Sequence, residues 1–262
     1  MTGIIDLRGR TALVTGGTGH LGFAISRALA LAGARVLVNS RSVEKARAAV
    51  ESLVAEGLDA VPAPFNLLDK RAIETYFGEN SSEIGIIVNN AYAGGAGSIE
   101  LAAPEDYRAA YEMVVVGAHR LVQHLLPRLR ASKARHGDAA VVNIASMYGT
   151  VSPDPRLYDT AGSRNPAFYG SAKAALIQWT RYAAIEFAPE GIRFNAVSPG
   201  PFPGGGVSRT RAEFVAKLCE RTPLGRIGRP EEVAGPVVML ASPVASYITG
   251  ANLAVDGGWT TW

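Results

Sequence analysis

A tyrosine and a lysine, Tyr169 and Lys173, stand four positions apart in a segment with helical patterning. Residues four apart share one face of a helix, so both side chains can reach the same site. A free tyrosine ionises near pH 10, and a nearby ammonium favours the phenolate and lowers its pKa. The pair therefore predicts proton transfer with a substrate, although chance also produces this spacing between surface residues.

A serine, Ser146, directly follows the predicted strand Ala139–Ala145. Its hydroxyl is expected at the carboxyl edge of a sheet, where ligands bind in open α/β folds. Ser146, Tyr169 and Lys173 together form a set that favours an enzyme with acid–base chemistry over a chance arrangement.

A glycine-rich turn runs from Thr15 to Gly22, between the first predicted strand and the first predicted helix. Glycines let the backbone approach a pyrophosphate, which then lies on the N–H groups of the helix. This placement favours dinucleotide binding over an ordinary turn. We expect the contacts to come from Gly16, Thr18, Gly19, His20, Leu21 and Gly22.

The end of the second predicted strand decides which nucleotide is bound. An acidic side chain there would pair with the ribose 2′-hydroxyl and repel a 2′-phosphate. This chain has Ser40 and Arg41 instead, and an arginine can pair with a 2′-phosphate. NADP(H) is therefore favoured and NAD(H) stays open, the alternative being that Arg41 points into water. After the third strand, Asn66 is placed to bind the adenine, with Leu67 beside it.

Short apolar segments alternate with amphipathic ones along the chain, as a parallel sheet covered on both faces requires. We therefore predict one doubly wound α/β domain, a Rossmann fold, over residues 1–262. Strands are predicted at Thr11–Thr15, Arg35–Asn39, Ala60–Pro64, Ile84–Asn89, Ala139–Ala145, Arg193–Ser198 and Asn252–Val255. Helices are predicted at Leu21–Ala32, Val43–Glu56, Pro104–Arg130, Phe168–Ala188, Ala212–Arg221 and Pro230–Leu240. The segment Pro199–Thr210, rich in proline and glycine, is predicted to be a mobile loop.

Composition excludes several other classes of protein. Of the 262 residues, 48% are hydrophobic and 19% are charged, which suits a globular domain. No apolar run reaches the length of a membrane span, and a net charge of +3 gives no footprint for nucleic acid. The single cysteine, Cys219, excludes an internal disulfide, and the four histidines lack metal-ligand spacing, so no metal is expected. The first ten residues lack a secretory pattern, which predicts a cytoplasmic protein.

Further motifs follow other predicted strands: Asn89-Asn90-Ala91, Ser198-Pro199-Gly200, and an ending from Gly250 to Gly258. With these motifs the sequence resembles the short-chain dehydrogenase/reductase family over essentially its whole length. The resemblance implies that Tyr169 is the general acid or base, that Lys173 lowers its pKa and anchors the ribose, and that Ser146 orients the carbonyl. It also implies that the cofactor cleft is bordered by Asn90, Ala91, Pro199 and Gly200.

The sequence departs from the family pattern at four points. The catalytic asparagine of the family falls at Val114, which cannot hold a relay water in the same way. The turn has the form TGxxGxxG of extended members, whereas the classical form has glycine at the position of His20. Ser146 and Tyr169 are 23 positions apart, wider than in classical members. Finally, Tyr92 replaces a frequent glycine, and it either projects toward the substrate or packs against neighbouring loops.

The favoured function is reversible hydride transfer between a nicotinamide and a carbonyl or secondary alcohol. The loop Ser152–Pro166 is expected beside the substrate, and Pro201–Glu213 is expected to close over it. A sugar or sugar acid and a small cyclic or aliphatic ketone both remain open as substrates. Candidate substrate contacts are Tyr92, Ser146, Tyr158 and Pro201, with further polar groups at Ser152, Asp154, Asp159, Arg164 and Asn165.

The sequence leaves two alternative functions open, and it also predicts a homo-oligomer. The chain could be a sugar epimerase or dehydratase that keeps its nucleotide, although its length leaves little room for a separate substrate domain. It could also be a nucleotide-binding sensor without catalysis, a reading that Val114 motivates. The predicted helices Pro104–Arg130 and Phe168–Ala188 carry surplus apolar positions, and the resemblance implies that they pair across a homodimer or homotetramer. The positions are Val114, Val115, Leu121, Leu125, Trp179 and Ile185, and the ending Trp259–Trp262 is expected to join another contact.

Overall fold

In the part of the chain that the structure describes, seven parallel strands form one sheet in the order β3-β2-β1-β4-β5-β6-β7. The computed structural model describes residues 5–80 and 82–261. The order reverses direction between β1 and β4, as in a doubly wound fold. The strands are β1 (Thr11–Val14), β2 (Arg35–Ser40), β3 (Ala60–Pro64), β4 (Ile86–Asn89), β5 (Ala139–Ile144), β6 (Ile192–Pro199) and β7 (Asn252–Val255). The prediction of a single Rossmann domain is confirmed.

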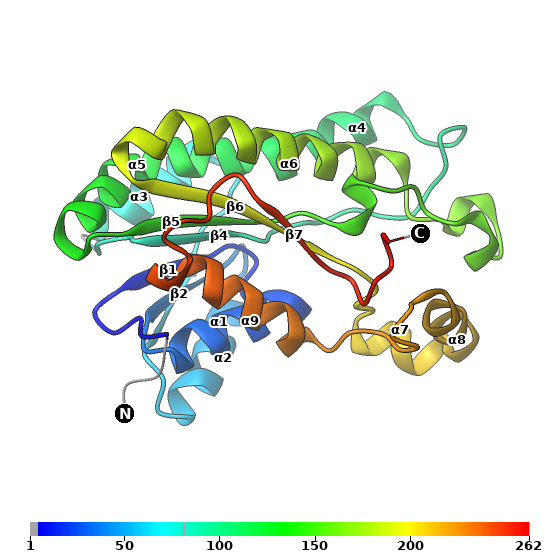
Figure 1. The fold of residues 1–262 in the computed structure, drawn as a ribbon, viewed down its shortest axis with the longest axis horizontal. Helices are drawn as coiled ribbons and strands as arrows, with labels where there is room; N and C mark the ends of the chain where they lie inside the picture. Colours follow the sequence, from blue (N-terminus) through cyan, green and yellow to red (C-terminus); the bar gives the residue numbers. More distant parts are fainter. Residues whose placement is uncertain (1–4, 81, 262) are drawn as a thin grey trace.

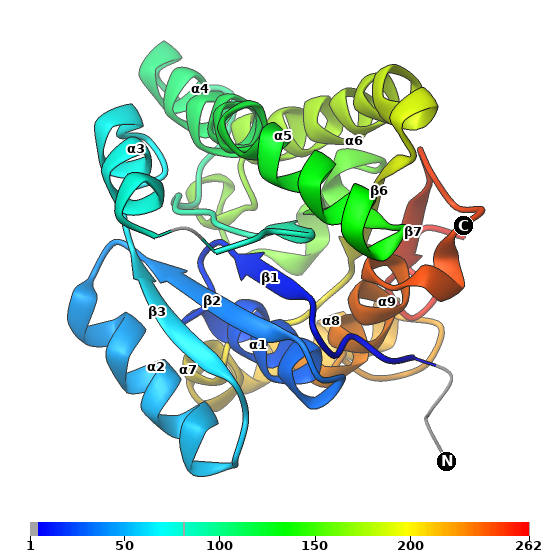
Figure 2. The ribbon, with the colours of Figure 1, turned by 90° about the vertical axis from the view of Figure 1, so that its left-hand side faces the viewer.

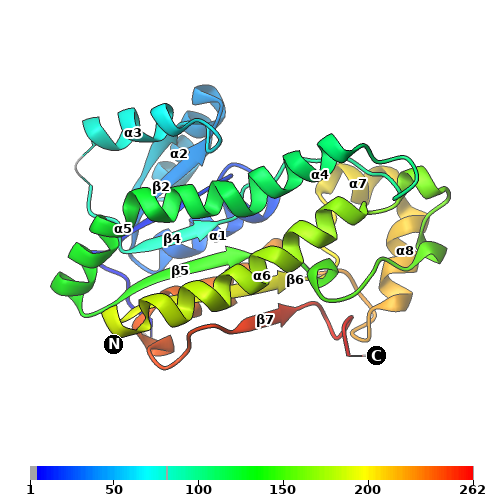
Figure 3. The same cartoon turned by 90° about the horizontal axis from the view of Figure 1, so that it is seen from above.

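Helices cover both faces of this sheet. The helices are α1 (His20–Leu31), α2 (Val43–Ala55), α3 (Lys70–Glu79), α4 (Pro104–Tyr111), α5 (Gly117–His136), α6 (Ala167–Phe187), α7 (Gly205–Thr210), α8 (Ala212–Arg221) and α9 (Pro230–Ala241). One layer contains α1, α2 and α9, and the opposite layer contains α3, α4, α5 and α6 (Figures 1 and 2). The pair α7 and α8 lies beyond the carboxyl ends of the central strands (Figure 3).

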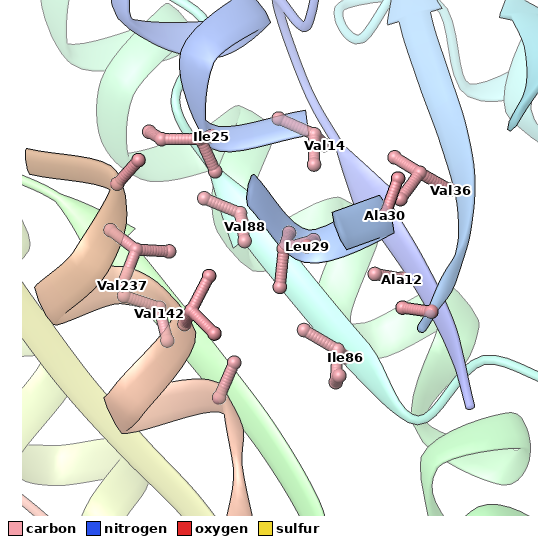
Figure 4. Packing of buried hydrophobic residues seen from close by; sticks show 14 of the residues in the cluster. Ala12, Val14, Ile25, Leu29, Ala30, Val36, Ile86, Val88, Val142 and Val237 are labelled. Atoms are coloured by element: carbon pink, nitrogen blue, oxygen red, sulfur yellow. The ribbon is translucent and has the colours of Figure 1, made fainter. Parts of the chain in front are cut away.

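The strands are apolar on both faces because each face is covered. Every residue of β5 and β6 is buried. Successive side chains point to opposite faces, so in β1 Val14 joins the cluster under α1 and α9, while Leu13 joins the cluster under α5. The first cluster brings Ile25 and Leu29 of α1 against Val237 of α9 (Figure 4). This double core fixes the strand ends, and with them the loops that carry function.

The predicted helix Pro104–Arg130 is wrong in detail, because it is not a uniform α-helix. A π-helical turn, Glu112–Val116, separates α4 from α5, and α5 continues to His136. A π-turn adds a residue and rotates the side chains that follow it, and such turns are frequent at functional sites. Here the turn carries Val114, which is buried against α6.

Two further segments differ from the sequence prediction. Helix α3 was not expected, although Asp69 caps its first turn and Ile73 and Phe77 bury one face of it. The segment predicted as a mobile loop contains α7, where Thr210 Oγ1 donates to Gly206 O and Arg211 N donates to Val207 O. Local hydrogen bonds thus override the low helix propensity of three consecutive glycines.

The surplus apolar positions expected between subunits are mostly buried within the chain itself. Val114, Val115, Leu121 and Leu125 are at most 6% exposed. Trp179 packs on Phe194, which leaves Ile185 exposed from the predicted set. Trp259 is 2% exposed, so the expected contact through the apolar ending is wrong at this position, and Trp262 lies outside the described residues.

Candidate active site

The glycine-rich turn forms a backbone cradle at the start of α1. Gly16 has a φ of +60°, which strains any residue other than glycine, and a Cβ there would lie 3.0 Å from Ala91 Cα. A Cβ on Gly22 would lie 2.1 Å from Gly16 O. No side chain among the described residues caps α1 at Gly19. The N–H groups of the first turn are therefore left to an anionic ligand.

Two residues from neighbouring strands hold this turn in place. Asn90, just after β4, donates from Nδ2 to Thr15 O and Gly16 O at 3.0 and 3.1 Å. Thr15 Oγ1 accepts from the N–H groups of Asn90 and Ala91. Asn39, near the end of β2, accepts from Gly16 N at its Oδ1 at 3.4 Å, and its Nδ2 donates to Ala63 O and Phe65 O. The turn is thus preorganised, and Asn39 is a supporting residue that sequence reasoning missed.

The remaining predicted cofactor residues follow β2 and β3 at the same edge of the sheet. Ser40 is half-buried and its Oγ accepts from Ser42 N, whereas Arg41 is exposed. Across residues 5–80 and 82–261 Arg41 forms no ion pair, so its guanidinium is available to a phosphate. Asn66 is exposed and its Oδ1 accepts from Leu68 N, which leaves its amide NH₂ for a ligand. Leu67 is buried in the core beneath α5.

Three predicted catalytic side chains meet at the carboxyl end of β5. Ser146 follows β5, and its Oγ accepts from Tyr148 N at 3.1 Å. Tyr169 and Lys173 approach from the first turns of α6, and the Lys173 Nζ atom lies 5.7 Å from the Tyr169 ring centroid. Lys173 Nζ donates to Ile144 O at 2.6 Å, so the last residue of β5 anchors the ammonium. The structure thus brings the predicted set together.

Burial controls the protonation of this set. It raises the pKa of Tyr169, and the hydrogen bond with the Ser146 hydroxyl acts in the opposite direction without reversing the shift. It also lowers the pKa of Lys173 to about 7. The predicted lowering of the Tyr169 pKa is therefore wrong for the chain by itself. Desolvation outweighs charge here, and Tyr169 keeps its proton at neutral pH.

The chain is similar in sequence to known oxidoreductases over nearly its whole length. Residues 18–260 match the family model described as Enoyl-(Acyl carrier protein) reductase. The rhamnolipids biosynthesis 3-oxoacyl-[acyl-carrier-protein] reductase of Pseudomonas aeruginosa is 33% identical over 258 residues, covering 97% of each chain. The 5-keto-D-gluconate 5-reductase of Escherichia coli is 30% identical over 275 residues, covering 98% of each. The chain belongs to the short-chain dehydrogenase/reductase family.

A solved structure of the family shows the same architecture. The gluconate 5-dehydrogenase of Burkholderia cenocepacia, in complex with NADP and tartrate, superposes with a TM-score of 0.87 at 28% identity. The match covers 100% of this chain and 99% of that one. The fold and its strand order are therefore those of the short-chain dehydrogenases/reductases over the whole chain.

Tyr92, where the family often has glycine, packs directly on Tyr169 and Lys173, the predicted catalytic pair. Its ring centroid lies 4.7 Å from that of Tyr169 in an edge-on arrangement, and Lys173 Nζ lies 5.8 Å away. Burial raises the pKa of Tyr92 to about 12. The Tyr92 hydroxyl is buried and has no hydrogen-bond partner in the described part of the chain. Tyr92 therefore packs against its neighbours and also borders the reaction site.

The remaining predicted residues lie around two cavities. Pro199 ends β6, and Gly200 N donates to Val255 O. Pro201 lines a cavity of about 440 Å³ with Phe202 and Asp256. A second cavity, of about 690 Å³, opens beside the loop before α6 and includes Ser152, Arg164 and Asn165. The neighbours of the catalytic residues, Tyr148 and Gly170, line it as well.

Other polar residues of the loop are engaged within the protein. The Tyr158 hydroxyl lies 3.2 Å from the Tyr148 hydroxyl, and its ring packs on Phe214 of α8. Asp154 pairs with Arg156, and Asp159 lies 3.5 Å from Arg211. The structure does not place Tyr158 in the lining of either cavity.

Two other kinds of site are absent from residues 5–80 and 82–261. These residues contain no group of three or more histidine, cysteine, aspartate or glutamate side chains placed to hold a metal ion. The helices described there also include none long and apolar enough to cross a membrane.

Proposed function

We propose that the chain is an NADP(H)-dependent oxidoreductase that interconverts a carbonyl group and a secondary alcohol. The observation that carries this proposal is the meeting of Ser146, Tyr169 and Lys173 beside a preorganised phosphate cradle. A Cβ at Gly16 or Gly22 would collide with Ala91 or with the Gly16 carbonyl, so glycines are required for the turn to pack this tightly against the start of α1. A tight turn with free N–H groups fits the pyrophosphate of a dinucleotide. A protein that only senses a nucleotide has no need of a buried acid–base pair.

The three side chains divide the proton chemistry between them. When bound, NADP(H) supplies the hydride that enters the carbonyl carbon or accepts it in the reverse direction. The Ser146 hydroxyl donates a hydrogen bond to the substrate oxygen and orients it. Tyr169 Oη delivers a proton to that oxygen during reduction and removes it during oxidation. Lys173, while charged, stabilises the phenolate that reduction leaves behind.

The protonation state favours reduction near neutral pH. Burial raises the pKa of Tyr169, so the hydroxyl carries the proton that a carbonyl oxygen needs. Oxidation needs the phenolate, so its rate is expected to rise with pH. A pH profile of kcat in both directions tests this, and an oxidation rate that falls as pH rises would contradict the assignment of Tyr169 as the base.

The 2′-phosphate of NADP(H) is assigned to Arg41. Ser40 ends β2 and Arg41 follows it, and neither position carries a carboxylate. Arg41 is exposed and forms no ion pair with any described residue. The related gluconate 5-dehydrogenase from Burkholderia cenocepacia was solved with NADP, which supports the same preference here. Asn66 and Leu67 would border the adenine, and Pro199 and Gly200 the nicotinamide.

The substrate is proposed to be a polyhydroxylated compound, such as a sugar acid. Polar groups of Ser152, Arg164 and Asn165 line the cavity beside the loop before α6. Two of the relatives are named for reactions on 5-keto-D-gluconate and gluconate. The segment Pro201–Glu213, with α7, would cover the substrate from the carboxyl side of the sheet.

Assembly is proposed through the layer that contains α4, α5 and α6. Three large side chains on this layer, Tyr111, Tyr182 and Ile185, are 49%, 69% and 78% exposed. A homodimer or homotetramer that buries them is the expected form in the cytoplasm. Size-exclusion chromatography with light scattering tests this, and a clean monomer would contradict it.

A cofactor-coupled screen tests the function as a whole. Sugar acids, sugars and ketones are offered with NADPH or NADP, and consumption must be stoichiometric with product. Constant nicotinamide absorbance during conversion would instead favour an epimerase. With an active substrate, Tyr169→Phe should lower kcat by at least about 100-fold and leave NADPH binding intact. Tyr247→Phe, at a fully exposed tyrosine, is the matched control and should change neither quantity.

A further inference from the structure

A small cavity lies between Lys173 and the π-helical turn. It is about 10 Å³ in volume, with apolar walls that include Val114, Ala118 and Leu176. Its polar side is formed by Thr15, Asn89 and Lys173. This volume accommodates about one water molecule, and a buried water needs two to four polar partners. The polar side therefore decides whether water is stable there.

A chain of hydrogen bonds fixes which atom of Asn89 faces this cavity. Thr180 Oγ1 donates to Leu176 O at 2.7 Å, so it can only accept from Asn143 Nδ2, which lies 2.8 Å away. Asn143 Oδ1 must then accept from Asn89 Nδ2, also at 2.8 Å. Asn89 is 6% exposed, and within the described part of the chain its Oδ1 has no hydrogen-bond partner.

Lys173 offers the matching donors. An ammonium has three N–H groups, and the hydrogen bond to Ile144 O uses one of them. Thr15 Oγ1 does not compete, because it already bonds to Val88 O and to the N–H groups of Asn90 and Ala91. The titratable side chains around Lys173 are Tyr169 on its own helix and Tyr92 after β4. Within the described residues no carboxylate forms an ion pair with Lys173.

We propose that one water molecule in this cavity bridges Lys173 Nζ and Asn89 Oδ1, and that Asn89 is a positioning residue for Lys173. The water accepts a hydrogen bond from the ammonium and donates one to the amide oxygen. Asn89 thereby does from β4 what Val114 cannot do from the π-helical turn. The catalytic consequence rests on the proposed function, whereas the water and its effect on Lys173 do not.

A direct test uses the protein without substrate or cofactor. A high-resolution crystal structure should show one water within hydrogen-bond distance of Asn89 Oδ1 and Lys173 Nζ. The pKa of Lys173, measured by NMR on ¹³C-labelled lysine, should fall by about one to two units in Asn89→Leu, because a hydrogen bond to a charged group is lost. Absence of the water from the wild-type protein, or an unchanged pKa in this variant, would overturn the proposal.

Three further variants separate positioning from simple support of the core. Val114→Leu fills the same cavity from its apolar wall and keeps the Asn89 hydrogen bonds, so it should lower the pKa of Lys173 in the same direction. Val114→Asn in the Asn89→Leu background should restore the pKa. The control Asn195→Leu removes another buried asparagine, whose Nδ2 donates to Ile248 O, and should leave the Lys173 pKa unchanged. A failure of Val114→Leu to lower the pKa would show that no water is displaced.

These readouts distinguish the inference from the proposed function. If no substrate is found but the water and the pKa shift are observed, the proposed function fails and the positioning of Lys173 stands. If catalysis is found but the water is absent, the proposed function stands and the positioning of Lys173 by Asn89 fails.

Discussion

Two groups of buried charged and polar side chains lie at opposite ends of the same strands. At the amino end, Arg10 precedes β1, Asp138 precedes β5 and Arg193 stands near the start of β6. At the carboxyl end, Ser146 and Lys173 surround the end of β5. Both groups are removed from water, yet they differ in how far their hydrogen-bonding capacity is used.

The amino-end group is paired around one carboxylate, although Arg10 Nε has no hydrogen-bond partner in the described residues. Arg193 makes two hydrogen bonds to the Asp138 carboxylate, at 3.0 and 3.2 Å, and two more to Leu240 O and Ser242 O. Arg10 donates to Asp138 O at 2.8 Å. These bonds tie β1, β5, β6 and the end of α9 together. A buried ionic group with this many partners is expected to support the fold.

The carboxyl-end group leaves polar atoms unused. In the described part of the chain, Asn89 Oδ1 and the Tyr92 hydroxyl have no hydrogen-bond partner. Lys173 is buried, donates one hydrogen bond to Ile144 O and has no counter-ion in residues 5–80 and 82–261, and burial lowers its pKa to about 7. Polar atoms without a hydrogen-bond partner in the protein can form hydrogen bonds with a ligand. At the amino end two guanidinium groups share a buried carboxylate, whereas at the carboxyl end no carboxylate among the described residues pairs with Lys173. This difference in charge pairing distinguishes the structural end of the sheet from the proposed reactive end.

Asp138→Asn should have the largest effect on stability. It leaves two buried guanidinium groups without their shared carboxylate, and breaking a buried pair costs about 3–5 kcal/mol. Urea unfolding should show this loss, with activity per folded molecule unchanged. The control Glu190→Gln breaks the partly exposed pair with Arg130 and should leave the free energy of unfolding almost unchanged, because exposed ion pairs contribute little. Equal losses in the two variants would mean that the amino-end group is not the structural one.

Lys173→Met should increase the stability of the protein, by an amount that depends on pH. Burial lowers the Lys173 pKa from 10.5 to about 7 in the folded chain, so between these values only the unfolded chain holds the extra proton. The stability of the wild-type protein therefore rises with pH across this window. Relative to the wild type, Lys173→Met should be most stable below pH 7 and lose this advantage by pH 10.5.

Thermal unfolding at several pH values measures this difference, at about 1.4 kcal/mol for each unit of pKa shift. Lys45→Met, on the exposed face of α2, is the control and should give a difference that does not change over the same window. A flat difference for Lys173→Met would show that the ammonium is not desolvated, and the contrast between the two ends would disappear.

The reactive end was largely predictable from the sequence because its signals are local. The glycine turn, the Tyr169–Lys173 spacing and each short strand are all contained within a few consecutive residues. The structural end was not predictable, since Arg10 and Asp138 are 128 positions apart and meet only in the folded sheet. Its residues look like ordinary surface charges in the sequence.

Features that depend on burial could not be predicted from the sequence either. The direction of the Tyr169 pKa shift follows from desolvation, which spacing alone does not reveal. The π-helical turn at Glu112–Val116 has the same apolar pattern as a continuous helix. Helix α3 was missed because its buried face rests on two residues, Ile73 and Phe77, although Asp69 was a usable capping signal.

Arg41→Ala should have the smallest effect on stability of the three variants. It tests whether an unpaired arginine after β2 serves ligand binding, in contrast to the paired arginines at the amino end. Arg41 is an exposed guanidinium without an ion pair in the described residues, unlike Arg10 and Arg193. Its removal should leave stability within about 0.5 kcal/mol. NADPH binding should weaken by about 10- to 100-fold, because a hydrogen bond between charged groups contributes roughly 1.5–3 kcal/mol. NADH binding should stay the same, because NADH lacks the phosphate.

Fluorescence titration with each nucleotide measures this selectivity, and Arg47→Ala, on the exposed face of α2, is the matched control. A parallel loss of NADH and NADPH binding would mean that Arg41 supports the backbone of the site. Unchanged binding of both would mean that Arg41 faces water, and that the preference for a 2′-phosphate lies elsewhere at this edge. A selective loss would show that an unpaired cation at the reactive end is kept for its ligand, as the incomplete pairing around Lys173 also indicates.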